Sequence, residues 1–177
     1  MGAEQRMTAT KGAVLSLLLD AYQRRDHVGL IVVRGETAYL ALPPTGSVVV
    51  AQRLLREVPT GGRTPLSHGL RLAATTLARY RRLEHERTPL LALISDGRAN
   101  VAMRHHDNPL TEAKMMAAEI RQLGVPSIVV NTESGFLRFD LAQELANALA
   151  ARCIRLEDLA AATLKRVVQQ ELPTARR

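Results

Sequence analysis

The chain of 177 residues has few aromatic residues and almost no cysteine. Aromatic side chains make up 3% of it and tryptophan is absent, so its core must be built from leucine, valine, isoleucine and alanine. The single cysteine, Cys153, excludes an internal disulfide bond and fits a reducing compartment. At this length we expect one domain that extends over residues 1–177.

Long apolar runs and nucleotide-binding loops are also missing from the sequence. No run approaches the roughly 20 apolar residues that span a bilayer, and residues 1–6 lack the apolar segment of a secretory signal. We therefore expect a cytoplasmic protein with no membrane contact. The absence of a Gly-Lys-Ser/Thr P-loop and of a Gly-x-Gly-x-x-Gly run excludes ATP or dinucleotide binding by those devices.

The charge is unbalanced, with a formal net charge of +7 that comes from an excess of arginine. A surplus of this size suits a nucleic acid, an acidic protein surface or simply a solvated exterior. The densest cluster, residues 79–87, also contains Glu84 and Glu86, and its one aromatic residue, Tyr80, is a poor platform for stacking bases. Nucleic-acid binding is thus an alternative that the sequence disfavours.

Apolar residues follow helical and strand periodicities in alternation along the chain. The helical spacing predicts helices at residues 7–24, 48–58, 64–82, 111–123, 140–150 and 157–171. Short apolar runs predict strands at residues 28–33, 37–42, 90–94, 127–131 and 152–156. Strands that alternate with helices predict an α/β fold with a doubly wound, mostly parallel sheet.

The first two strands are predicted to form a hairpin. Gly35 and Glu36 separate them, and the second strand, at residues 37–42, is expected to be the one antiparallel edge of the sheet. Pro43 and Pro44 are expected to end this strand, because proline has no N–H to donate to a neighbouring strand.

Two loops form the leading candidate site. Thr64 follows a pair of glycines and precedes Pro65, which favours Thr64 as the N-cap and Pro65 as the first residue of a helix. Asp96 follows an apolar strand and precedes Gly97. Loops at the carboxyl ends of strands bind ligands in open α/β sheets, and a hydroxyl and a carboxylate suit Mg²⁺. A simple helix cap and a simple turn would fit the same spacing.

Three runs of residues resemble the von Willebrand factor A (integrin I-like) domain. They are Gly62-Arg63-Thr64-Pro65-Leu66, Ser95-Asp96-Gly97-Arg98-Ala99-Asn100, and Arg34-Gly35-Glu36 followed by Leu42-Pro43-Pro44-Thr45. More narrowly, they resemble the C-terminal domains of the D subunit of magnesium chelatase and of related metal-chelatase subunits. The resemblance extends from residue 1 to about residue 156. It implies that Thr64 and Asp96 are the second and third elements of a metal-ion-dependent adhesion site, which hold Mg²⁺ directly or through water.

The first element of that site is not in this sequence. In the family an Asp-x-Ser-x-Ser motif ends a central strand just before the first helix, and this chain opens at that place with Met1-Gly2-Ala3. The resemblance therefore implies a missing central strand, open edges on strands 28–33 and 90–94, and weak or absent Mg²⁺ binding by Thr64 and Asp96 alone. We expect an N-terminally truncated domain whose native start lies upstream.

The resemblance also implies a function. A partner's Glu or Asp would fill the open coordination position of the bound Mg²⁺, which makes the domain a metal-dependent protein–protein contact. In a magnesium or cobalt chelatase of tetrapyrrole biosynthesis, it would couple an AAA+ ATPase subunit to the large porphyrin-binding subunit without being the catalytic centre. Two alternatives remain: a degenerate domain that binds its partner without metal, and a hydrolase in which Asp96 holds a metal that activates water.

Overall fold

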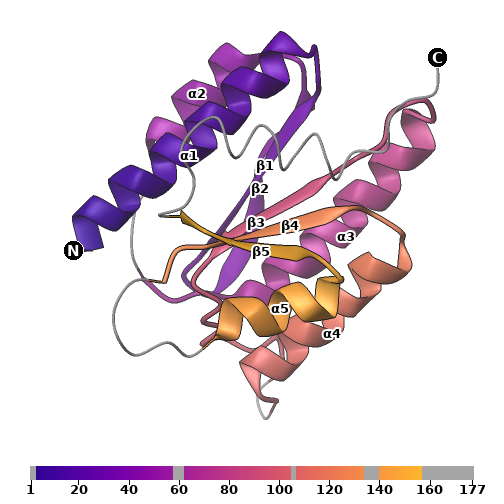
Figure 1. The fold of residues 1–177 in the computed structure, drawn as a ribbon. Coiled ribbons are helices and arrows are strands. Elements are labelled where there is room, and N and C mark those ends of the chain that lie inside the picture. The colour runs from indigo at the N-terminus through magenta and orange to yellow at the C-terminus, as the bar shows by residue number, and fades with distance from the viewer. Residues whose placement is uncertain (1–2, 58–61, 105–106, 134–139, 157–177) are drawn as a thin grey trace.

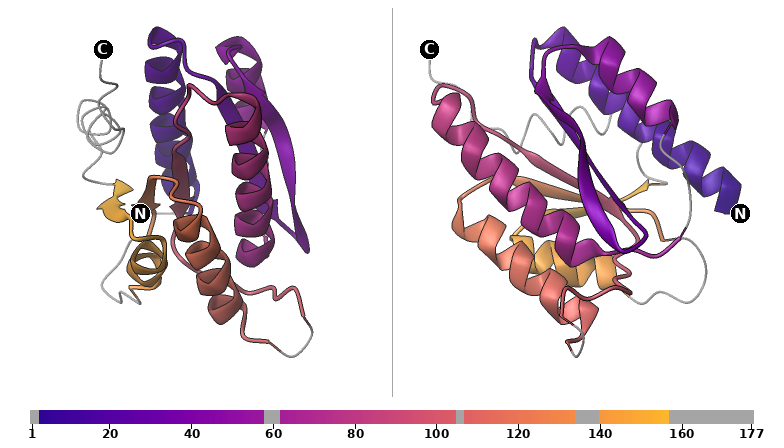
Figure 2. Two further views of the ribbon diagram at one scale, coloured as in Figure 1. Left: turned by 90° about the vertical axis from the view of Figure 1, so that its right-hand side faces the viewer. Right: turned by 180° about the vertical axis from the view of Figure 1, so that it is seen from behind.

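The described part of the chain is a three-layered α/β domain. The structure, a computed structural model, describes residues 3–57, 62–104, 107–133 and 140–156. Helices α1 (Ala3–Gln23) and α2 (Val48–Glu57) lie together on one side of the strands, and three helices cover the other side (Figures 1 and 2): α3 (Leu66–Leu83), α4 (Pro109–Gln122) and α5 (Leu141–Leu149). The predicted helix at residues 157–171 lies outside the described residues.

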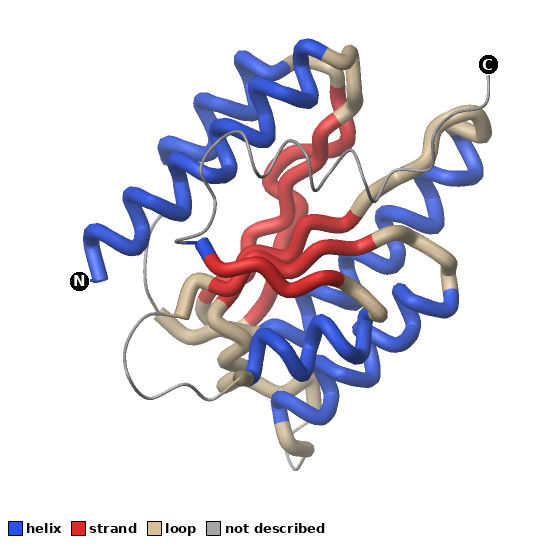
Figure 3. Tube along the Cα trace, viewed as in Figure 1, coloured by secondary structure: helices blue, strands red, loops and turns tan. Residues whose placement is uncertain are grey.

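The strands form two separate sheets instead of one (Figure 3). Strands β1 (Val28–Arg34) and β2 (Thr37–Thr45) make an antiparallel hairpin. Strands β3 (Leu91–Ser95), β4 (Ser127–Asn131) and β5 (Arg152–Arg155) make a parallel sheet in the order β3-β4-β5. Within the described residues no strand pairs with β1 on the side away from β2, or with β3 on the side away from β4. The α/β class and the antiparallel strand agree with the sequence prediction, as does the lack of a described strand between β1 and β3.

Because β3 has a described neighbour on one side only, its residues are less buried than those of β4. All four residues from Ser127 to Val130 in β4 are buried, whereas Ala92 in the equally apolar β3 is exposed. The difference follows from position, because β4 has a strand on each side and β3 has only one described neighbour.

Helices, not a continuous ladder of hydrogen bonds, hold the hairpin to the parallel sheet. On one side, Leu18 of α1 packs in a cluster with Leu42 of β2, while its neighbour Leu17 packs against Ile128 of β4. On the other side, Leu70 of α3 belongs to the main core, against which Ile31 of β1 packs. The two sheets therefore share their apolar interior without sharing backbone hydrogen bonds.

Strand β2 continues through both prolines, so the prediction that they end it was wrong. It runs to Thr45, whose partner in β1 is Val28. The register shifts around Leu30, which marks an irregularity in the ladder there. A Cβ atom on Gly29 would lie 3.3 Å from Cγ of Pro44, so the glycine leaves room for the proline ring. Prolines are tolerated in this strand because it is an edge strand with an irregular ladder.

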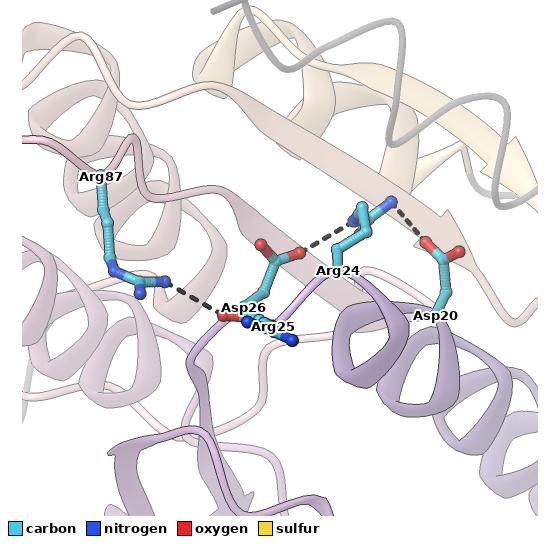
Figure 4. Close-up of polar contacts among 5 residues, drawn as sticks. All are labelled: Asp20, Arg24, Arg25, Asp26 and Arg87. Carbon is cyan, nitrogen blue, oxygen red and sulfur yellow. Dashed lines mark hydrogen bonds and ion pairs between the residues drawn. The ribbon is translucent and has the colours of Figure 1, made fainter.

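An arginine-rich junction fixes the end of α1 (Figure 4). Arg25 has a φ of 57° after the last helical turn, and the Nε of Arg24 donates to Oδ2 of Asp26 at 2.9 Å. Arg24 is also ion-paired with Asp20. The carbonyl oxygen of Arg25 accepts a hydrogen bond from Nη1 of Arg87 at 3.2 Å, which ties α1 to the segment after α3.

Among the described residues, no helix combines the length and apolarity needed to cross a membrane.

Candidate functional site

The two predicted site loops are joined by a reciprocal pair of hydrogen bonds. The backbone N–H of Thr64 donates to Oδ1 of Asn100 at 2.6 Å, and the backbone N–H of Asn100 donates to the carbonyl oxygen of Thr64 at 3.2 Å. Asn100 lies four residues after Asp96 in the same loop. The loop that follows β3 is therefore attached to the start of α3, as expected for loops at one edge of the sheet.

Thr64 does not cap α3, which corrects the sequence prediction. The helix begins at Leu66, and the residue before it, Pro65, has φ −77° and ψ 68° with no side-chain cap hydrogen bond. These angles are those of an inverse γ-turn, and the N–H of Leu66 donates to the carbonyl oxygen of Thr64 at 3.0 Å across it. The turn places Thr64 one residue too early to act as the N-cap.

Asp96 lies at the end of β3, in a turn that its own side chain stabilises. Its Oδ1 accepts the backbone N–H of Arg98 at 3.1 Å, and its Oδ2 lies 3.6 Å from Nε of the same arginine. The hydroxyl oxygen of Ser95 accepts the N–H of Gly97 at 3.1 Å. The Asp96 side chain is 36% exposed, so the carboxylate is oriented by its turn and still accessible to solvent.

Gly97 brings this turn into contact with the start of α5. It is buried and has a φ of +81°. A Cβ atom at this position would lie 2.2 Å from the backbone nitrogen of Ala142 and 2.4 Å from the carbonyl carbon of Leu141. Only glycine fits both the conformation and the space, which explains why it follows Asp96.

The hairpin turn reaches the same region. The backbone N–H of Gly35 donates to the carbonyl oxygen of Arg63 at 3.0 Å, and the Arg63 side chain is ion-paired with Glu36. The hairpin turn, the Thr64 loop and the Asp96 loop, which carry most of the family resemblance in the sequence, therefore lie together in space.

Sequence reasoning missed the roles of Asn100 and Glu112. In the sequence Asn100 is one residue of a motif, and Glu112 is one residue of the helix predicted at residues 111–123. In the structure Glu112 is 6% exposed, and its carboxylate accepts the backbone N–H groups of Met103 at 2.6 Å and Arg104 at 3.1 Å. An acidic residue on the buried side of an amphipathic helix was the one signal that could have identified it.

The surroundings of Glu112 favour its charged form. Burial alone would raise the pKa of the Glu112 carboxyl, but the hydrogen bonds from Met103 and Arg104, together with the side chains of Ser67 and Asp107, bring the pKa below its ordinary value. Glu112 is therefore an ionised carboxylate held inside the domain next to the candidate site.

The donor chemistry of Thr64 and Asp96 fits part of a magnesium site. A hydroxyl and a carboxylate are the oxygen donors that this cation takes, and it also retains several water ligands. Within the described residues no group of three or more His, Cys, Asp or Glu side chains could hold a metal ion. These two residues could therefore supply two ligands, and the rest would come from water, a further motif or a partner.

Comparison with known proteins places this geometry in a family. A sequence profile of the von Willebrand factor type A domain matches residues 1–98. An uncharacterised protein of Mycobacterium tuberculosis is 41% identical over 169 residues, which are 96% of this chain and 26% of that protein. An uncharacterised protein of Methanocaldococcus jannaschii is 36% identical over 160 residues, which are 90% of this chain and 91% of that protein. The magnesium-chelatase 60 kDa subunit of Cereibacter sphaeroides is 45% identical over 135 residues, which are 73% of this chain and 24% of that subunit.

Solved structures share the fold at lower identity. The manganese-loaded TRAP protein of Plasmodium vivax has a TM-score of 0.62 and 17% identity, over 93% of this chain and 66% of that one. An aerotolerance-related membrane protein of Bacteroides fragilis has a TM-score of 0.64 and 19% identity, over 92% of this chain and 87% of that one. The chain spans about a quarter of the length of its mycobacterial and chelatase relatives, and nearly all of the archaeal one. It belongs to the von Willebrand factor type A domain family and is related to magnesium-chelatase subunits.

Proposed function

We propose that this chain is a protein–protein interaction domain of a magnesium or cobalt chelatase, and that Thr64 and Asp96 contribute to a metal site at the contact. The Mg²⁺ held there would leave one coordination position for a Glu or Asp of the partner. The partners would be the AAA+ ATPase subunit and the large porphyrin-binding subunit, and the domain would couple them without catalysing metal insertion.

The observation that most supports this proposal is the pair of hydrogen bonds between Thr64 and Asn100, which joins the Thr64 loop to the Asp96 loop. It brings a hydroxyl-bearing and a carboxylate-bearing loop together at one edge of the sheet, in a domain related to magnesium-chelatase subunits. The Asp96 carboxylate is also accessible enough to meet a cation or a partner. The net charge of +7 suits a partner with an acidic surface.

A metal-independent contact is the second candidate, and the environment of Asp96 favours it. One oxygen of Asp96 already accepts the Arg98 N–H, and the other lies near the Arg98 guanidinium. A cation would therefore compete with Arg98 for this carboxylate.

Surface-binding measurements with immobilised chain would separate the two candidates. The probes are the ATPase and porphyrin-binding subunits of the Cereibacter sphaeroides magnesium chelatase, applied in Mg²⁺ and in EDTA. We expect binding that EDTA weakens at least tenfold and that Asp96→Asn and Thr64→Val weaken to a similar degree, because one ligand lost from a small set removes most of the affinity.

The matched control is Thr75→Ala, which removes the hydroxyl of an exposed threonine on α3 that donates to the Arg71 carbonyl. Binding that is equal in Mg²⁺ and EDTA and insensitive to Asp96→Asn would support the metal-independent contact. Binding to neither subunit would contradict the chelatase assignment.

A further inference from the structure

Glu112 is the one acidic side chain among the buried polar residues of the described part, and the proposed contact does not use it. Burying a carboxylate is costly unless hydrogen bonds replace its water. Each oxygen of Glu112 has such a replacement: Oε2 accepts from Met103 and Oε1 from Arg104. The question is what this arrangement achieves.

Capping its own helix is not the role of Glu112. The N-cap of α4 is Asn108, whose Oδ1 accepts the N–H groups of Leu110 and Thr111. The Glu112 carboxylate instead reaches back to residues that are eight and nine positions earlier in the chain. Its hydrogen bonds therefore fix the loop before α4.

That loop is the one that carries the candidate site. Between Asp96 and Arg104 it is held at Asn100, which bonds to Thr64, and at Val101, which is 7% exposed. Glu112 supplies the last attachment, two residues beyond Val101. Ser67, a fully buried residue in the first turn of α3, is close enough to Glu112 to lower the pKa of its carboxyl. Glu112 is thus bonded to the end of the Asp96 loop and lies close to the helix that Thr64 precedes.

We propose that Glu112 is a positioning residue, whose carboxylate holds the loop after β3 so that Asn100 stays bonded to Thr64 and the two site loops keep a fixed separation. This inference rests on the proposed function for its biological meaning. The physical link from Glu112 to Thr64 can be measured without any metal or partner.

The test is amide hydrogen exchange of the full chain, followed by nuclear magnetic resonance, in the unmodified protein and in Glu112→Gln. The variant keeps the shape of the side chain but loses the charge and turns one acceptor into a donor. We expect the Thr64 amide to exchange about tenfold faster, because its acceptor on Asn100 is no longer held in place. The core amide of Val129 reports global unfolding, and Glu119→Gln on the exposed side of the same helix is the matched control.

A second variant protects the test if Glu112→Gln does not fold. Asn100 is exposed, so Asn100→Ala removes the acceptor at the other end of the same attachment and should speed Thr64 exchange directly. In the unmodified protein the chemical shifts of the Met103 and Arg104 amides should change together with pH as Glu112 titrates, because both amides donate to its carboxylate. This pH-dependent change should vanish in Glu112→Gln. A purely structural role in α4 would change Val129 and Thr64 exchange together and leave their ratio constant.

Line broadening by added Mn²⁺ then separates the two proposals. Selective broadening near Thr64 and Asp96 that weakens at least tenfold in Glu112→Gln supports both. Absence of broadening in the unmodified protein would count against the metal site, while the exchange comparison would still decide the role of Glu112. Unchanged Thr64 exchange in a folded Glu112→Gln protein would overturn the positioning role even if Mn²⁺ binds.

Discussion

At the scale of single residues, two members of the candidate site could be predicted from the sequence, but the contacts that hold them could not. Asp96 and Thr64 could be selected from the sequence because of their place after a strand and before a helix. The attachment between them could not, because it depends on the amide of Asn100 pairing across 36 residues. The role of the Glu112 carboxylate could not be predicted for the same reason. Its partners are backbone groups of a loop, and no spacing rule specifies the path of that loop.

Gly97→Ala should destabilise the domain strongly. The new methyl group would lie 2.2 Å from the nitrogen of Ala142 and would also require a φ near +81°. We expect a loss of about 3 kcal/mol in the free energy of unfolding, from overpacking and backbone strain together. Chemical denaturation measures this loss.

Gly124→Ala is the control, because Gly124 has a φ of +66° but nothing within 4 Å of its Cβ position, and strain alone should cost about 1 kcal/mol. Equal losses in the two variants would show that the contact with α5 is unimportant.

Glu112 should make stability depend on acid pH. Its pKa in the folded protein lies below the ordinary value, so its contribution is fully present above the ordinary glutamate pKa and is lost as the pH falls through the lowered one. We expect Glu112→Gln to cost about 2 kcal/mol at pH 7, and the cost to shrink below about pH 4. Urea unfolding of both proteins between pH 3 and 7 tests this. A cost that stays constant over this range would mean that the charge of Glu112 contributes nothing.

At the scale of elements, the sequence predicted every described helix and strand, with errors at their ends. Helix α3 begins at Leu66 because Pro65 is used in a γ-turn, which the favoured pairing of a threonine cap with a following proline did not anticipate. Strand β2 passes through Pro43 and Pro44 because Gly29 opposite leaves space for a ring. Both errors arise from contacts made by a neighbouring segment, which local propensity does not contain.

The packing of α3 on β1 can be tested at Gly69. A Cβ atom there would lie 2.4 Å from Cγ2 of Val33, so the helix lies closer to the strand than an alanine permits. Alanine favours the helix by up to about 1 kcal/mol, yet we expect Gly69→Ala to destabilise by about 2 kcal/mol because the clash outweighs that gain.

A double-mutant cycle with Val33→Ala gives the control. Val33→Ala removes the methyl group that the new side chain would strike, so the double variant should lose less than the sum of the two single losses by at least about 1 kcal/mol. Thermal unfolding of the four proteins provides the cycle. Additive losses would place the two residues out of contact.

At the scale of the whole molecule, the main feature is a sheet divided in two. Strands β1 and β3 both carry apolar side chains, and neither pairs with a described strand on the side that faces the other. The resemblance to the family implied this division, whereas periodicity alone predicted a single continuous sheet. Strand order depends on which strand edges meet in space. The apolar pattern of a strand shows that it is buried but not which strand pairs with it.

The apolar edges of β1 and β3 that have no described partner should promote association between copies of the chain. Ala92 is exposed on β3, and a lysine there should discourage edge-to-edge pairing without altering the core. We expect Ala92→Lys to reduce concentration-dependent association in sedimentation velocity while changing the free energy of unfolding by less than about 0.5 kcal/mol. Met115→Lys, at a residue on α4 that is 60% exposed, is the control for added charge. A chain that stays monomeric at every concentration would show that the edges are already protected.

The most direct test of a metal site at the Thr64 and Asp96 loops is a titration of the isotope-labelled chain with Mn²⁺. We predict weak binding that selectively broadens the amide signals of residues 64–66 and 96–100, is displaced by Mg²⁺, and disappears in Asp96→Asn but persists in Thr75→Ala. Broadening that is spread over the surface, or that is identical in Asp96→Asn, would contradict a metal-dependent contact at this edge of the sheet.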